Sequence, residues 1–121
     1  MPIPLNPGDI FLSGLQGAAG KKIRPVVILS SPGYHRCRPD VIVGAVTTNL
    51  GRASTPSDYA LLDWAESGLD RPSAFRSFVT TLARNTLGPR LGRLSERDWL
   101  AVQGCLKFAL AGTGSAGLDL D

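Results

Sequence analysis

Short apolar runs, each bounded by glycine, proline, asparagine or other turn-forming residues, make up most of the chain as far as residue 94. These runs are rich in valine and isoleucine, and they are too short to show the periodic pattern of a core-facing helix. Because β-branched residues pack well on a pleated surface, the pattern favours strands. The predicted strands are Asp9–Leu15, Arg24–Ser30, Asp40–Thr48, Asp58–Leu62, Ala74–Leu82 and Arg90–Leu94.

The segments between the predicted strands have the composition of loops and turns. Gly17–Gly20, with the sequence Gly-Ala-Ala-Gly, is expected to form a small flexible loop before the second strand. Such a loop either closes over a ligand or, as is commoner, only connects the two strands of a hairpin. Tyr34–Pro39 is polar and basic, and we expect a loop there because Ser31-Pro32-Gly33 ends the preceding strand. Asn85–Pro89 is expected to form a tight turn.

One helix is predicted after the strands. Ser95 is a good N-cap, and Glu96 and Asp98 place negative charge in the first turn, where the helix dipole favours it. Apolar residues then recur at helical spacing on one face, which should dock on the sheet. That face carries Trp99, Val102, Leu106, Ala109 and Leu110.

Several short strands followed by one helix predict a mainly β (α+β) fold, in which a compact β-barrel has a helical lid. A chain of 121 residues without an internal repeat or a linker fits a single domain, which we place at residues 1–111. Residues 112–121 are small, glycine-rich and acidic at the end, so we expect a flexible tail there.

The composition, with 43% hydrophobic and 19% charged residues, is that of a globular domain. No apolar run approaches the roughly 20 residues that a membrane-spanning helix requires, and Met1–Leu5 lacks the pattern of a signal peptide. A cytoplasmic protein without a membrane partner is therefore expected. The net charge of +3, with basic residues concentrated in residues 21–38 and 71–97, favours an anionic partner.

The use of cysteine and histidine argues against a metal site, and no cofactor is expected. The chain has two cysteines, Cys37 and Cys105, one histidine, and neither a CxxC nor an HExxH motif. Without an export signal, both cysteines are expected to be free thiols. His35 is expected to be exposed or to contact phosphate, because it is a single histidine in a basic loop between Tyr34 and Arg36.

Three cations, Lys21, Lys22 and Arg24, precede the second predicted strand. Pro25 fixes its own φ and disfavours the helical region for Arg24, so the guanidinium should stand at a rigid, extended strand entrance. A rigidly held guanidinium suits bidentate contact with a phosphate. The alternative is a solvated basic loop in front of a core strand, and this stretch taken by itself favours that alternative.

In order and spacing, several segments together resemble the MazF/PemK family of ribonuclease toxins from bacterial toxin–antitoxin pairs. The likeness extends from about Pro7 to Ala111, and no single motif decides it. The matching segments are Gly8–Phe11, Arg24–Val27, Asp40–Val43, Thr47–Leu50, Pro72-Ser73 and Leu91–Ser95.

The resemblance implies an SH3-like small β-barrel of the CcdB/PemK type, a homodimer, and metal-independent cleavage of single-stranded RNA. It also implies a cognate, MazE-like antitoxin whose extended tail fills the RNA groove. The catalytic arginine of the family corresponds to Arg24 and its catalytic threonine to Thr47, or to Thr48 if the register shifts by one. On this basis Thr48, Arg76 and Ser77 are expected to bind RNA. Lys21, Lys22 and Arg52 are expected to attract RNA through their charge.

Two segments depart from the family pattern. The loop before Arg24 is Gly-Ala-Ala-Gly where relatives often carry acidic or aromatic residues, and Arg76–Val79 is one residue short and lacks a common acid. Both regions contact substrate in the family, so the RNA sequence that is cut cannot be carried over. Two alternatives use the same barrel: a toxin that poisons gyrase, and an RNA-binding module without catalysis.

Overall fold

The computed structural model describes residues 4–18 and 20–111. The tail expected at residues 112–121 lies outside the described residues. The described residues form strands, α-helices and two single 3₁₀ turns. The elements are β1 (Asp9–Gly17), β2 (Gly20–Ile28), α1 (Pro32–Cys37), β3 (Asp40–Thr47), η1 (Leu50–Arg52), β4 (Asp58–Ala60), β5 (Ala74–Ala83), η2 (Arg84–Thr86), β6 (Arg90–Arg93) and α2 (Glu96–Ala109).

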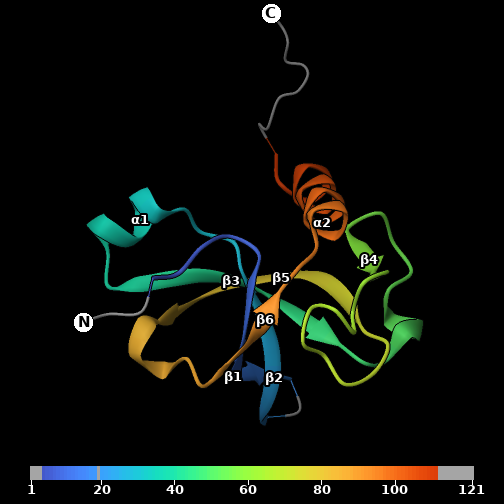
Figure 1. The fold of residues 1–121 in the computed structure, drawn as a ribbon, viewed down its shortest axis with the longest axis horizontal. Coiled ribbons are helices and arrows are strands. Elements are labelled where there is room, and N and C mark those ends of the chain that lie inside the picture. Colours follow the sequence, from blue (N-terminus) through green and yellow to red (C-terminus); the bar gives the residue numbers. More distant parts are fainter. Residues whose placement is uncertain (1–3, 19, 112–121) are drawn as a thin grey trace, which may run out of the picture.

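The described strands form one six-stranded sheet in the order β4-β5-β3-β2-β1-β6. Every neighbouring pair is antiparallel. The β1–β2 hairpin runs across the direction of β3 and β5 in Figure 1, so the sheet is strongly curled into a half-barrel, with α2 against one side. This arrangement confirms the predicted class of a small β-barrel with a C-terminal helix. Neither helix in the described part of the chain is long and apolar enough to cross a membrane.

The two faces of the sheet bury separate apolar clusters, because alternate residues of a strand point to opposite faces. Val27 belongs to the cluster beneath α2, and its neighbour Val26 belongs to the other cluster. The cluster beneath α2 contains Ile10, Val27, Val46, Leu61, Leu69, Phe75, Leu94, Val102 and Cys105. The second contains Leu5, Phe11, Leu15, Val26, Ile28, Val41, Val43 and Ala45.

Backbone packing brings the segment after β4 onto β6. Gly68 has φ +92°, and a β-carbon there would overlap the carbonyl of Leu91. A β-carbon at Gly92 would overlap the carbonyl of Ser67 in the same way. Two glycines therefore permit the close approach that joins opposite ends of the curled sheet, and a side chain at either position would separate them.

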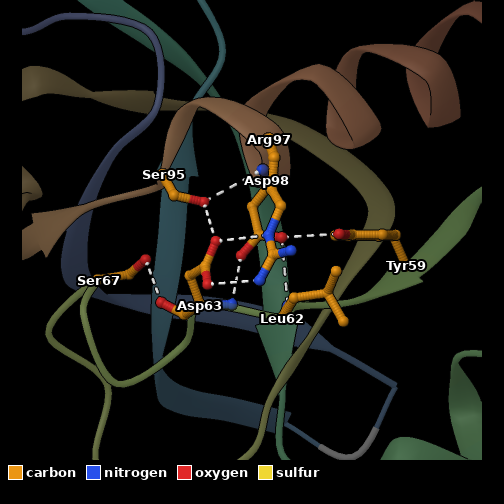
Figure 2. Close-up of polar contacts among 7 residues, drawn as sticks. All are labelled: Tyr59, Leu62, Asp63, Ser67, Ser95, Arg97 and Asp98. Atoms are coloured by element: carbon orange, nitrogen blue, oxygen red, sulfur yellow. Dashed lines mark hydrogen bonds and ion pairs between the residues drawn. The ribbon is translucent and has the colours of Figure 1, made fainter.

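The first turn of α2 is tied to the segment after β4 through the buried carboxylate of Asp98 (Figure 2). Asp98 accepts hydrogen bonds from the Tyr59 hydroxyl at 2.7 Å and from the backbone N–H of Asp63 at 2.8 Å. The Arg97 guanidinium donates to both carboxylate oxygens of Asp63, each at 2.9 Å, and Ser95 Oγ also donates to Asp63 at 2.6 Å. The acids expected to complement the helix dipole thus include one that fastens the helix to the sheet.

One local prediction was wrong. The expected loop at Tyr34–Pro39 is largely helical, because Ser31 Oγ accepts from the backbone N–H of Tyr34 at 3.1 Å and Pro32 suits the first turn of α1. At Gly17–Gly20 the hairpin connection is confirmed, since Gly17 pairs with Gly20 at the end of a longer hairpin. The turn expected over Asn85–Pro89 begins one residue earlier, as the single 3₁₀ turn η2.

The predicted docking face of α2 is correct except at its end. Val102 is fully buried, and Trp99 and Leu106 pack against the cluster beneath the helix. Ala109 and Leu110 are exposed, because the chain there has passed beyond the buried cluster. The structure also has both cysteines free, as expected, with Cys37 exposed and Cys105 buried.

Candidate functional site

Arg24 and Thr47 line a single groove of about 440 Å³. The end of the β1–β2 hairpin forms one wall, the end of β3 and the turn after it form another, and Arg76 and Phe78 of β5 complete the lining. A groove of this volume lies within the range of ordinary ligand sites. We call it the main groove.

The pairing of β2 with β3 explains why Arg24 and Thr47 meet. The last paired residues are Val26 and Ala45, and continuing the antiparallel register by two residues sets Arg24 opposite Thr47. Since alternate residues share a face, both side chains lie on the same face as Val26 and Ala45. Pro25 pairs with Leu12 of β1 and has no N–H to offer β3, so the strands can separate here and leave the groove open.

The hydroxyl of Thr47 is held in place by its own backbone turn. Thr47 is half-buried, and its Oγ1 accepts a hydrogen bond from the backbone N–H of Asn49 at 3.0 Å. A hydroxyl has one proton to donate as well as two lone pairs. The contact with Asn49 uses a lone pair, so the proton of Thr47 can be donated to an acceptor in the groove. Thr48 also lines the groove and is exposed.

The lining of the main groove is basic. Lys22, Arg52 and Arg76 stand beside Arg24, and no described residue of the lining is acidic. Lys22 lies on the same face of β2 as Arg24, two residues away. A concave surface that gathers cations without compensating carboxylates attracts a polyanion and tracks its backbone.

A bulge in β5 directs Arg76 to the groove. Ala45 of β3 pairs with Arg76, whereas the adjacent Gly44 pairs with Val79, so Ser77 and Phe78 have no partner on β3. Bulges of this kind bend a strand and re-aim its side chains. The Nε atom of Arg76 is buried and makes no hydrogen bond among the described residues.

Two of the predicted RNA-binding residues do not line the main groove. Lys21 lies on the other face of β2, where its side chain passes over Gly14. Ser77 lines an adjoining hollow, and its hydroxyl donates to the carbonyl of Ser57 at 2.7 Å. RNA binding by both residues stays a prediction.

The structure adds groove residues that sequence reasoning had not assigned to RNA. Gln16 and Asn49 line the groove, and Asn49 also caps η1 through its side chain. Asn49 was visible only as part of the matching Thr47–Leu50 segment, and no local signal distinguished Gln16. His35 does not line the groove: its Nε2 lies 2.7 Å from Ser30 Oγ, and burial lowers the pKa of its imidazole.

Comparison with known proteins assigns the chain to a family. Residues 6–110 match the family of PemK-like, MazF-like toxins of type II toxin–antitoxin systems. A protein of Staphylococcus saprophyticus named endoribonuclease MazF is 30% identical over 107 residues, which cover 85% of this chain and 88% of that protein.

Solved structures share the fold. A mycobacterial endoribonuclease, solved in complex with its cognate antitoxin, has a TM-score of 0.75 at 22% identity, covering 93% of this chain and 100% of that one. A chain of the MazE–MazF structure from Deinococcus radiodurans has a TM-score of 0.66 at 18% identity, covering 92% and 98%. From the match over nearly its whole length, the chain belongs to the PemK-like, MazF-like toxins of type II toxin–antitoxin systems.

Proposed function

We propose that this protein is the toxin of a type II toxin–antitoxin pair, an endoribonuclease that cuts single-stranded RNA in the main groove. The observation that carries the proposal is the shared position of Arg24 and Thr47 in a groove lined by further cations and by no described acid. The named relative is an endoribonuclease, which fits this lining. The protein acts as a homodimer in the cytoplasm, where RNA is abundant.

The cognate antitoxin of this protein occupies the same groove. The mycobacterial relative was solved with its antitoxin, and the Deinococcus structure joins MazE with MazF. An extended antitoxin tail with acidic side chains would complement the cations of the groove and exclude RNA by competition.

RNA supplies its own nucleophile for the reaction. The 2′-oxygen attacks the adjacent phosphorus, an O2′–P bond forms, and the P–O5′ bond breaks. The products are a 2′,3′-cyclic phosphate and a 5′-hydroxyl, after one proton has left the 2′-oxygen and another has reached the 5′-oxygen. No metal ion is needed for this balance.

Arg24 stabilises the charge that develops on the phosphoryl oxygens. A guanidinium donates two parallel hydrogen bonds to a phosphate, and these strengthen as negative charge builds in the transition state. Thr47 donates its hydroxyl proton to a phosphoryl oxygen or orients the 2′-hydroxyl. Neither side chain is a base at neutral pH, so the two residues position and stabilise the phosphate and do not take the proton from the 2′-oxygen.

The test is cleavage of mixed single-stranded RNA by the purified protein in excess EDTA, followed by mapping of the new 5′ ends. We expect discrete cuts at a recurring sequence, and loss of cleavage in Arg24→Ala and Thr47→Ala variants that keep the wild-type circular dichroism spectrum. Uncut RNA at high protein concentration would remove the proposal. Salt-sensitive RNA binding without new ends would indicate the non-catalytic barrel instead.

A further inference from the structure

The turn that follows β3 holds the Thr47 hydroxyl, and packing does not hold this turn. Residues 48–52 are all exposed. The pairing of β3 with β2 has stopped at Ala45, and its pairing with β5 ends at Thr47 itself. Neither neighbouring strand supports the chain beyond this point, so hydrogen bonds within the segment must fix its shape.

Asn49 makes the hydrogen bonds that define this turn. Its backbone N–H donates to Thr47 Oγ1 at 3.0 Å, and no other described residue bonds to that hydroxyl. Its side-chain Oδ1 accepts from the backbone N–H of Gly51 at 3.2 Å, and its carbonyl accepts from the backbone N–H of Arg52 at 3.0 Å. One residue thus connects the candidate catalytic hydroxyl to η1, which carries Arg52 into the main groove.

The side chain of Asn49 fixes the direction of its own N–H. An asparagine that accepts a hydrogen bond from the residue two places on closes an Asx-turn, which restricts the backbone of the asparagine. Asn49 has φ −85° and ψ 89°, which is neither helical nor fully extended. Without the bond from Gly51, this exposed backbone would sample other angles, and its N–H would leave Thr47 Oγ1 for part of the time.

The direction in which the Thr47 hydroxyl donates depends on this N–H. While the Asn49 N–H occupies one lone pair of Oγ1, the hydroxyl proton is directed away from the turn. Once the N–H has left, the hydroxyl rotates freely and the threonine side chain gains rotamers. A group that has to be ordered again during the reaction contributes less to the rate than one already in place.

We propose that Asn49 is a positioning residue for RNA cleavage, because its side chain holds the turn whose N–H orients the Thr47 hydroxyl. This inference rests on the proposed function, since Asn49 acts through Thr47. Asn49 also lines the main groove, and its Nδ2 makes no hydrogen bond to a described residue. Direct donation from Nδ2 to RNA is a different role, which the experiment separates from positioning.

Single-turnover cleavage at saturating RNA isolates the step in which Thr47 takes part. Asn49→Ala removes the Oδ1 acceptor, and the rate should fall roughly three- to tenfold, the loss expected for one cap. Asn49→Asp keeps the acceptor and loses the Nδ2 donors, so it should restore most of this rate. The negative charge that Asn49→Asp brings to a basic groove should weaken RNA binding instead.

A double-mutant cycle shows whether Asn49 acts through the Thr47 hydroxyl. In a Thr47→Val background, followed for long enough to measure its residual rate, Asn49→Ala should cause no further loss. Ser31→Ala is the matched control, because it removes an equivalent cap, the bond from the Tyr34 N–H to Ser31 Oγ at 3.1 Å, outside the groove lining. This control should leave the rate unchanged and so exclude an effect of general destabilisation.

An unchanged rate in Asn49→Ala would overturn the positioning role. So would a loss in Asn49→Asp as large as in Asn49→Ala, or an equal loss from Asn49→Ala with and without the Thr47 hydroxyl. In each of these cases the wild-type protein would still cut RNA and lose activity in Arg24→Ala, so the proposed function would stand. If the wild-type protein does not cut RNA, the proposed function fails and the positioning role fails with it.

Discussion

Arg24 and Thr47 extend the β2–β3 pairing beyond its last pair, Val26 with Ala45, and so lie on one face of the sheet in one groove. The relationship depends on two neighbouring strands whose pairing stops two residues before these side chains. The guanidinium and the hydroxyl are therefore placed by the sheet and not by a loop, which limits their freedom before a substrate arrives. Geometry of this kind suits a reaction in which the protein mainly positions and stabilises a phosphate.

Replacing Arg24 by lysine should abolish most activity although the charge is kept. Lysine lacks the planar fork that holds a phosphate through two parallel bonds. We expect kcat for RNA cleavage to fall roughly 10²–10³-fold, the usual loss when one preorganised oxyanion donor is removed. Steady-state kinetics on an RNA oligonucleotide provides the measurement. Full activity of Arg24→Lys would show that only a positive charge is required there.

At Thr47 the hydroxyl and not the shape of the side chain should matter. Thr47→Ser keeps the hydroxyl and should retain much of the wild-type rate, whereas the isosteric Thr47→Val should lose it. Thr48→Val is the matched control, since Thr48 is exposed in the same groove. Single-turnover cleavage rates distinguish the three variants. A greater loss in Thr48→Val than in Thr47→Val would move the catalytic role to Thr48.

The contact between Tyr59 and Asp98 should stabilise the fold. The Tyr59 hydroxyl donates to a fully buried carboxylate, and burial followed by this hydrogen bond raises the pKa of Tyr59 to about 12. Tyr59→Phe should lower the free energy of unfolding by about 1.5–3 kcal/mol, measured in urea. Tyr34→Phe, which removes a similar bond to the less buried Asp40, should cost less. An equal loss of unfolding free energy in the two variants would show that the hydrogen bond to Asp98 stabilises the fold no more than the hydrogen bond to Asp40 does.

The Asp63–Arg97 ion pair should make stability fall in acid. The Arg97 guanidinium, and after it the Ser95 hydroxyl, lowers the pKa of Asp63 below its ordinary 3.8. A lowered pKa in the folded state contributes stability that is present above the ordinary value and is lost as the pH falls through the lower one. Urea midpoints at pH 7 and pH 3 should therefore differ less in Arg97→Met than in the wild type. If the two midpoints differ as much in Arg97→Met as in the wild type, carboxylates other than Asp63 cause the loss of stability in acid.

The strands, the start of α2 and the extended backbone at Arg24–Pro25 could be predicted because each depends on neighbouring residues. The strand entrance expected at Arg24 was wrong, because β2 begins at Gly20 and Arg24 lies in its middle, paired with Ser13. The short helix α1 could not be predicted, since six residues show no helical period and only the Ser31 cap marks its start. The burial of Asp98 depends on Tyr59, which lies 39 positions away. Local charge rules therefore assigned Asp98 only to the helix dipole.

Arg76 shows the same limit within the site. The family likeness gave it a contact with RNA, but its place in the main groove follows from a bulge. The bulge is set by the pairing of Gly44 with Val79 and of Ala45 with Arg76, between strands far apart in sequence. No pattern along β5 alone specifies that register shift, so the place of Arg76 in the groove could not be predicted before the fold was known.

The most direct measurement of the central claim is a double-mutant cycle on Arg24→Ala and Thr47→Ala, with kcat/KM for one RNA substrate measured in excess EDTA. If both side chains act on the same phosphodiester, the loss in the double variant should be well below the product of the two single losses, because either change alone disables the shared site. Losses that multiply fully would mean that the two residues act independently, and would contradict the account.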